Sequence, residues 1–135
     1  SNTYPLPCTY PDGSDIEIFD FKSLEQSSKK AFLPSDKEHV TKYLWNSKKF
    51  KCKRIDNKKN LSNYRYTIDT IDDFKLFSFI IKKNLGNYLN LTMNKIIKLI
   101  DKNPSLVKYQ KKIKRNFGWI DSLKKDKSYK IRKKC

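Results

Sequence analysis

The stretch of sequence that decides the fold runs from residue 64 to residue 74 and reads YRYTIDTIDDF. Its first five residues alternate between large apolar and polar side chains, which is the period of two expected for a half-buried strand. The apolar positions of this alternation are Tyr64, Tyr66 and Ile68. Asp69 stands where the strand would end, so the pattern predicts a strand that stops at an acidic residue.

A helix is predicted directly after this acid. The Thr70 hydroxyl can accept a hydrogen bond from an amide of the first turn, and Asp72 and Asp73 sit where the helix dipole favours negative charge. Apolar residues then recur at helical spacing on one face: Ile71, Phe74, Phe77, Ile81 and Leu85. An acid between a strand and a helix lies where α/β folds place their ligands, so Asp69 is a candidate functional residue.

The same residues carry a resemblance to a known family. The run RYTIDTIDDF resembles the late strand, acid and helix signature of the cytidylyltransferases that activate sugars and sugar acids, above all the branch assigned to spore coat polysaccharide biosynthesis. Three further blocks resemble the same branch in the same order: YPDGSDIEIF at 10–19, SDKEHVT at 35–41, and IKRNFGW with SLKKD at 113–126. The resemblance therefore covers nearly the whole chain.

The family's opening block is absent from this sequence. Its members begin with a loop of the form R-x-x-S-x-R-L-P-x-K, which wraps the triphosphate of CTP, and no segment here is similar to it. Residues 1–135 are therefore expected to be the C-terminal part of a cytidylyltransferase domain, with the α/β class and the three-layer, Rossmann-like (GT-A-type) nucleotidyltransferase fold that the resemblance implies. Residues 1–3 resemble the mid-chain S-N-T of the family, so they need not be a secretion signal or a vector remnant.

The resemblance also implies an activity and a metal. The intact protein would transfer CMP from CTP to a sugar or sugar acid with Mg²⁺, for a surface polysaccharide such as a spore coat, and the fragment alone would be inactive. A carboxylate is a suitable ligand for Mg²⁺, so Asp69 would be the catalytic metal ligand. Sugar-acid synthetases usually carry D-x-D here, whereas this chain has Thr67-Ile68-Asp69, which leaves the acceptor sugar open. The other reading of Asp69 is an acid that satisfies helix amides.

Four further residues are expected on the acceptor side by the same resemblance: Asp15, Glu17, Glu38 and His39. Carboxylates can accept hydrogen bonds from sugar hydroxyls, and an imidazole can meet an anionic or hydroxyl group. Each also has a structural reading. Glu38 can pair with Ser35 in a capping box, and a single histidine near a helix start is often structural.

Composition sets limits that do not depend on the resemblance. Hydrophobic residues are 37% and charged residues 33% of 135, so the core is modest and we expect support from a missing half or a homo-oligomer.

No apolar run approaches the ~20 residues of a membrane span and no signal-peptide pattern opens the chain, so a cytoplasmic location is expected. Cys8, Cys52 and Cys135 lack C-x-x-C spacing, which favours three reduced thiols over a disulfide framework or a zinc site.

The net charge of +17 suggests a different function. A basic chain can bind nucleic acid or another polyanion, so a non-catalytic basic module that holds a polyanion or a partner chain is the alternative. The charge is mainly lysine, whereas specific reading of phosphates and bases favours arginine, and no nucleic-acid-binding motif is present. We therefore expect no specific nucleic-acid partner. The basic residues are densest near the end, where 124–135 is expected to be a solvated tail.

The remaining pattern alternates between strands and helices. Strands are predicted at 15–19, 50–55 and 64–68, and helices at 21–31, 34–46, from 70 to a stop near Gly86, and from Thr92 to a stop near Pro104. This order is typical of an α/β fold without internal repeats.

Overall fold

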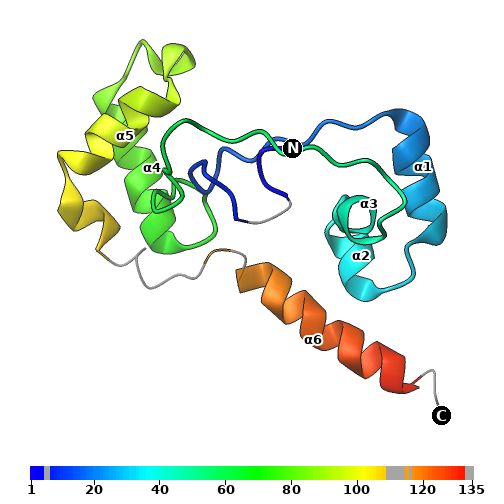
Figure 1. The fold of residues 1–135 in the computed structure, drawn as a ribbon. Coiled ribbons are helices and arrows are strands. Elements are labelled where there is room, and N and C mark those ends of the chain that lie inside the picture. Colours follow the sequence, from blue (N-terminus) through cyan, green and yellow to red (C-terminus); the bar gives the residue numbers. More distant parts are fainter. Residues whose placement is uncertain (5–6, 109–114, 116, 133–135) are drawn as a thin grey trace. The chain divides into compact units, whose positions relative to one another are not determined.

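The computed structural model describes residues 1–4, 7–108, 115 and 117–132. These residues form six α-helices and two short 3-10 turns (Figure 1). The helices are α1 Phe21–Lys30, α2 Pro34–Glu38, α3 Lys42–Asn46, α4 Ile71–Lys83, α5 Met93–Asp101 and α6 Phe117–Arg132, and the turns are η1 Tyr88–Asn90 and η2 Pro104–Val107. Within this described part, no helix is long and apolar enough to cross a membrane.

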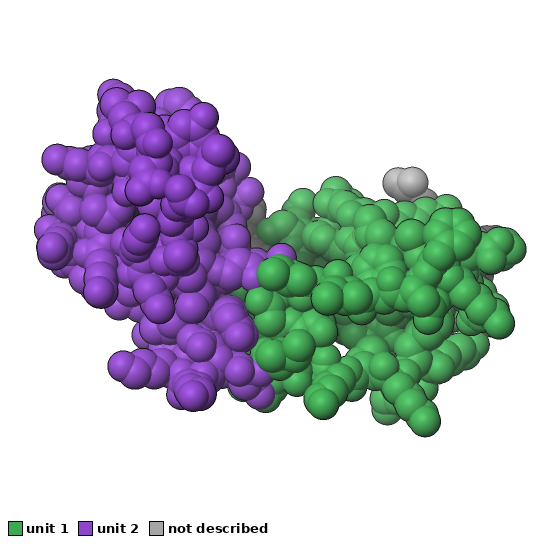
Figure 2. Space-filling model, turned by 90° about the horizontal axis from the view of Figure 1, so that it is seen from above, with its two compact units in different colours: residues 1–8, 16–55, 115–135 green, residues 9–15, 56–114 purple. Residues whose placement is uncertain are grey.

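The chain divides into two compact units, which Figure 2 colours separately. Unit 1 comprises residues 1–8, 16–55 and 115–135, and unit 2 comprises residues 9–15 and 56–114. Unit 1 therefore contains α1, α2, α3 and α6, and unit 2 contains α4 and α5.

The first turn of α4 is closed by hydrogen bonds between Thr70 and Asp73. The Asp73 amide donates to the Thr70 hydroxyl at 3.2 Å, and the Asp73 carboxylate accepts from the Thr70 amide at 3.0 Å. This reciprocal capping box satisfies two amides that would otherwise lack partners, and it confirms the predicted helix start at Thr70. Thr92 caps α5, as predicted, through one hydrogen bond that its side chain accepts from the Lys95 amide at 3.4 Å.

The core of unit 2 lies on a different face of α4 from the predicted stripe. Leu76 and Ile80 are buried against Ile100 of α5, with Tyr64 and Tyr66 packed beside them. The residues of the predicted stripe are largely exposed: Ile71 68%, Phe74 54%, Phe77 40% and Leu85 75%. Helix α4 is apolar on two sides, and the periodicity that predicted the helix does not say which side meets α5 and η2.

The predicted strands are not confirmed within the described residues. An isolated parallel bridge joins Asp12 to Arg65, where the Asp12 amide donates to the Tyr64 carbonyl and the Tyr66 amide donates to the Asp12 carbonyl, both at 2.9 Å. Residues 16–20 and 51–55 belong to no helix or strand, and their backbone pairs at single points, such as Ile55 with Ser1. A strand needs a hydrogen-bonded neighbour along its length, so these single contacts do not amount to a sheet. The α/β class therefore stays unconfirmed.

Unit 1 is held together by contacts between α2, α3 and α6. The single helix predicted over 34–46 is two short helices, α2 and α3, separated at residues 39–41. The predicted capping box between Ser35 and Glu38 is wrong, because Ser35 donates through both its amide and its hydroxyl to Asp126 of α6. Helix α1 agrees with its prediction and is capped by Asp20, which accepts from the Ser23 amide at 2.6 Å.

Two sequence expectations fall partly outside the described residues. Of the predicted free cysteines, Cys8 is buried and Cys52 exposed, whereas Cys135 lies outside the described part. Residues 124–132 of the expected basic tail belong to α6, and 133–135 are again outside it. Residues 113 and 114 of the fourth family-like block are not described either.

Candidate functional site

Asp69, the candidate metal ligand, is one of three carboxylates around the guanidinium of Arg65. Arg65 Nη1 lies 2.6 Å from Asp12 Oδ2, and Nη2 lies 2.6 Å from Asp69 Oδ2 and 2.9 Å from Asp73 Oδ2. Arg65 Nε also donates to Asp73 Oδ1 at 3.1 Å. We call these four residues the Arg65 cluster. They bring together the two family-like blocks at 10–19 and 65–74.

The backbone explains why these side chains converge. The bridge between Asp12 and Arg65 sets the two residues beside each other, and Asp73 is fixed by its role in the α4 cap. Gly13 adopts a φ of +102°, and a Cβ on it would lie 3.1 Å from the Thr67 amide nitrogen. The turn at 12–13 therefore needs glycine both for its left-handed backbone and for its close approach to residues 66–67.

The electrostatics of the Arg65 cluster leave an excess of negative charge. Three carboxylates face one guanidinium, so the cluster carries two negative charges in excess when all are ionised. Burial disfavours the charged guanidinium, but its hydrogen bonds to Asp73 and Asp69 and the charge of Asp12 outweigh burial and raise the pKa of Arg65. Arg65 is therefore a permanent cation that holds Asp12 and Asp73, whose side chains are 15% and 0% exposed.

Asp69 differs from the other two carboxylates because its side chain is 66% exposed. Its Oδ2 is bonded to Arg65, and its Oδ1 has no hydrogen bond within the described part of the chain. Mg²⁺ at nucleotide sites is commonly held by one or two carboxylates together with phosphate oxygens and water. Asp69 fits that role as a single ligand. Over residues 1–4, 7–108, 115 and 117–132, no group of three or more His, Cys, Asp or Glu side chains could hold a metal by itself.

The four residues expected on the acceptor side have different local partners. Asp15 belongs to unit 2, where its carboxylate accepts from the Gly13 amide at 3.1 Å and closes the turn. Glu17 belongs to unit 1 and lines a pocket there. Two residues of the same D-x-E motif therefore serve different units.

Glu38 and His39 contact α6. His39 Nε2 shares a hydrogen bond of 3.0 Å with the Ser122 hydroxyl, and Lys125 Nζ donates to Glu38 at 3.4 Å. The hydrogen bond from Ser122, followed by that from Lys125, lowers the pKa of Glu38. Both residues thus join the end of α2 to α6 in this structure.

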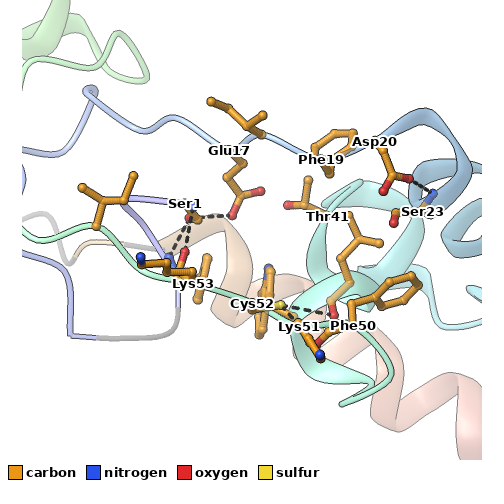
Figure 3. A pocket seen from close by; sticks show the side chains of 15 residues that line it. Ser1, Glu17, Phe19, Asp20, Ser23, Thr41, Phe50, Lys51, Cys52 and Lys53 are labelled. Atoms are coloured by element: carbon orange, nitrogen blue, oxygen red, sulfur yellow. Dashed lines mark hydrogen bonds between the residues drawn. The ribbon is translucent and has the colours of Figure 1, made fainter.

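The Glu17 pocket has a volume of about 400 Å³ and lies wholly within unit 1 (Figure 3). Its walls come from Ser1 and Tyr4, residues 17–20, the first turn of α1 at Ser23, Thr41 with α3, and residues 50–53 with Ile55. Glu17 accepts from the Ser1 hydroxyl at 3.3 Å, whereas the other carboxylate of the pocket, Asp20, is turned to Ser23 (Figure 3). The backbone hydrogen bond from Ser23 lowers the pKa of Asp20.

Sequence reasoning missed a buried ionic network in unit 1. Lys42 Nζ lies 3.0 Å from Asp36 and 3.3 Å from Asp126, and it also donates to the Ser35 hydroxyl. All four residues are 5% exposed or less. Burial acts to raise the pKa of Asp126, but hydrogen bonds from Ser35 and the charge of Lys42 outweigh it and lower that pKa. In the sequence, Ser122 and Asp126 stand four residues apart, which places two polar side chains on one face of a helix. This spacing is the signal that could have indicated the buried polar contacts of α6.

Comparison with known proteins gives two matches over most of the chain, whereas no family model matches. The uncharacterized protein MJ1063 of Methanocaldococcus jannaschii is 36% identical over 97 residues, which are 70% of this chain and 39% of that protein. The structure of a cytidylyltransferase from Leptospira borgpetersenii serovar Hardjo-bovis is 36% identical, with a TM-score of 0.64 over 73% of this chain and 41% of that chain. The chain spans about two fifths of the length of each. It is therefore similar in both sequence and fold to part of a cytidylyltransferase, which supports a place in that family and a nucleotidyltransferase-like fold.

Proposed function

We propose that this chain is part of a nucleotidyltransferase that transfers CMP from CTP to a sugar or sugar acid for a surface polysaccharide. The observation that carries the proposal is the combined likeness in sequence and fold to a cytidylyltransferase, at 36% identity and a TM-score of 0.64. The acceptor and the spore coat role are further parts of the proposal, and they rest on the family-like motifs. A cytoplasmic site of action is proposed with them.

The Arg65 cluster supports the assignment of Asp69 as the metal ligand. Mg²⁺, when bound, would neutralise phosphate charge and orient the α-phosphorus for attack. The described residues supply the support for such a ligand: Arg65 orients the Asp69 carboxylate, and Asp73 accepts from the Asp69 amide at 3.1 Å. A ligand held at both its side chain and its backbone is positioned before the metal arrives.

Release of pyrophosphate from CTP tests the activity. The protein to assay is one that contains this chain together with a CTP-binding loop of the form R-x-x-S-x-R-L-P-x-K, with Mg²⁺ and a panel of sugars and sugar acids. We expect turnover with at least one acceptor and a loss of about 100-fold in Asp69→Asn.

Asp72→Asn is the matched control. Asp72 also lies in the first turn of α4, but it is paired on the surface with Lys75 at 2.9 Å, so its removal should leave turnover within about threefold of the unmodified protein. Absence of pyrophosphate release with every acceptor, or equal effects of the two substitutions, would contradict the proposal.

The net charge of +17 favours a second candidate, a basic module that binds a polyanion. Such binding releases counterions and therefore weakens steeply as salt rises. Affinity for unrelated duplex DNA, measured between 50 and 200 mM salt, separates the candidates. A fall of about 10³-fold or more would favour the basic module, whereas weak binding at all salt concentrations would favour the nucleotidyltransferase.

A further inference from the structure

The turn between α4 and α5 exposes large apolar side chains to water. Leu85 is 75%, Tyr88 51% and Leu89 86% exposed. Figure 1 shows the turn that joins the adjacent ends of these two helices. A single exposed apolar residue needs no explanation, but a group of them in one turn indicates a surface that contacts something other than water. We call this segment the 85–89 turn.

Hydrogen bonds on both sides of the 85–89 turn fix its backbone. The Asn87 amide donates to the Asn84 carbonyl at 2.9 Å, and the Asn84 side chain donates to the Ile80 carbonyl at 2.7 Å. The Asn90 side chain donates to Asn87 Oδ1, also at 2.7 Å. Leu91, the next apolar residue, packs against the core of unit 2. The apolar side chains of the turn are therefore held toward water by an ordered backbone, while Leu91 supplies the core contact.

Lysines flank the 85–89 turn on both sides along the chain. Between Asp73 and Asp101 the sequence contains five lysines and no acidic residue. Lys82 and Lys83 end α4, and Lys95 lies in the first turn of α5, so all three stand next to the turn. At 1.5 Å per residue, Asp73 is about 15 Å from Lys83 along α4, which is more than the screening length of about 8 Å in physiological salt. The end of unit 2 that carries the turn is therefore positively charged.

We propose that the 85–89 turn docks on the surface of an anionic lipid bilayer, with its apolar side chains in the interfacial region and the flanking lysines against the headgroups. Leucine and aromatic side chains bordered by lysine are typical of segments that lie in the plane of a membrane surface. Tyrosine is favoured at the level of the headgroups, and each lysine near an anionic surface adds to the attraction. This contact is peripheral, and it does not rest on the proposed function.

Other occupants account for fewer of these observations. A nucleic acid would supply phosphates for the lysines, but its charged backbone offers no apolar layer for Leu85 and Leu89. A second copy docked turn against turn would bring the same lysines together, and like charges repel. An anionic bilayer is complementary to both the charge and the apolar side chains.

Cosedimentation with vesicles tests the proposal. The chain is mixed with vesicles of phosphatidylcholine alone, or with about 30% phosphatidylglycerol, near 0.15 M salt. It should bind the anionic vesicles about tenfold or more tightly than the neutral ones. The double variant Leu85→Ser with Leu89→Ser should weaken this binding about tenfold, because it removes the side chains that enter the bilayer. Lys82→Gln with Lys83→Gln should weaken it by a similar factor.

Two matched variants serve as controls. Ile16→Ser with Ile18→Ser removes apolar side chains that are 61% and 87% exposed, but these two residues flank Glu17, so their surroundings are acidic. Lys58→Gln with Lys59→Gln removes the same charge from exposed positions of unit 2 outside the turn. Each control should leave vesicle binding within about threefold of the unmodified chain. All substituted side chains are exposed, so the fold should persist, which circular dichroism checks.

The outcomes separate the bilayer from the other occupants. Equal binding to neutral and anionic vesicles, or equal effects of the test and control variants, would overturn the proposal. So would binding of duplex DNA, but not of vesicles, that depends on the lysine pair alone. The preference for anionic vesicles should persist in a protein that also carries the CTP-binding loop, and its loss there would show that another segment covers the turn and would overturn the proposal. Pyrophosphate release is measured without vesicles, so failure of docking can be told apart from failure of the proposed function.

Discussion

Replacement of Arg65 by methionine should destabilise unit 2 strongly. Methionine keeps much of the apolar stem of arginine but removes four hydrogen bonds to Asp12, Asp69 and Asp73. Asp73 is fully buried, so its carboxylate would keep the amide donors of Asp69 and Thr70 but lose the Arg65 guanidinium. Breaking a buried ion pair by removing one partner costs about 3 to 5 kcal/mol. The pair with the exposed Asp69 adds about 1 kcal/mol at most.

We therefore expect Arg65→Met to lower the free energy of unfolding of unit 2 by about 3 kcal/mol or more. The measurement is hydrogen exchange of the α4 amides, which reports on unit 2, while the fluorescence of Trp45 and Trp119 reports on unit 1. Lys75→Met is the control, because Lys75 is 65% exposed and its pair with Asp72 should be worth less than about 1 kcal/mol. A loss below about 1 kcal/mol for Arg65→Met, or a loss equal to that of the control, would refute the reasoning.

Three further predictions concern the turn, the buried network and the exposed face of α4. Gly13→Ala should lower the stability of unit 2 by about 1 kcal/mol or more in urea unfolding, because of its positive φ and the 3.1 Å approach to Thr67, and unchanged stability would contradict this account of the turn. The folded-state pKa of Asp126 is lowered, so its contribution to the stability of unit 1 is present above the unfolded pKa of about 3.9 and is lost as pH falls through the lower folded pKa. Asp126→Asn should therefore reduce the loss of unit 1 stability in acid, measured by Trp fluorescence, and an unaltered pH profile would argue against this. The chain should self-associate more tightly as salt screens its +17 charge, and Phe74→Ser, at a position 54% exposed, should weaken the association in sedimentation; a monomer at every salt concentration would count against an exposed face that needs a partner.

Local signals in the sequence were sufficient to predict where α4 and α5 begin. Thr70 and Thr92 cap their helices as predicted, because capping depends on residues within one turn of each other. The alternation also predicted a strand around Arg65, where the structure has a single bridge position. The partner, Asp12, could not be predicted because it lies 53 positions away.

The misses share the same cause, which is contact between distant residues. Ser35 was predicted to cap its own helix, but it donates to Asp126, 91 residues away. The face of α4 that is buried could not be predicted, because Leu76 and Ile80 pack against α5 while an equally apolar face stays exposed. For the candidate site, the pairing of Asp69 with Arg65 and the different hydrogen-bond partners of Asp15 and Glu17 are visible only in the structure.

Binding of Mn²⁺ in place of Mg²⁺ tests the central claim, that Asp69 is a metal ligand, most directly. Mn²⁺ broadens the NMR signals of nearby amides, so titration of the ¹⁵N-labelled chain with Mn²⁺ and CTP should broaden residues 69–71 first. Asp69→Asn should abolish this localised broadening, and Asp72→Asn should preserve it. Broadening that is absent, that is spread evenly over the acidic residues, or that persists in Asp69→Asn would contradict the account.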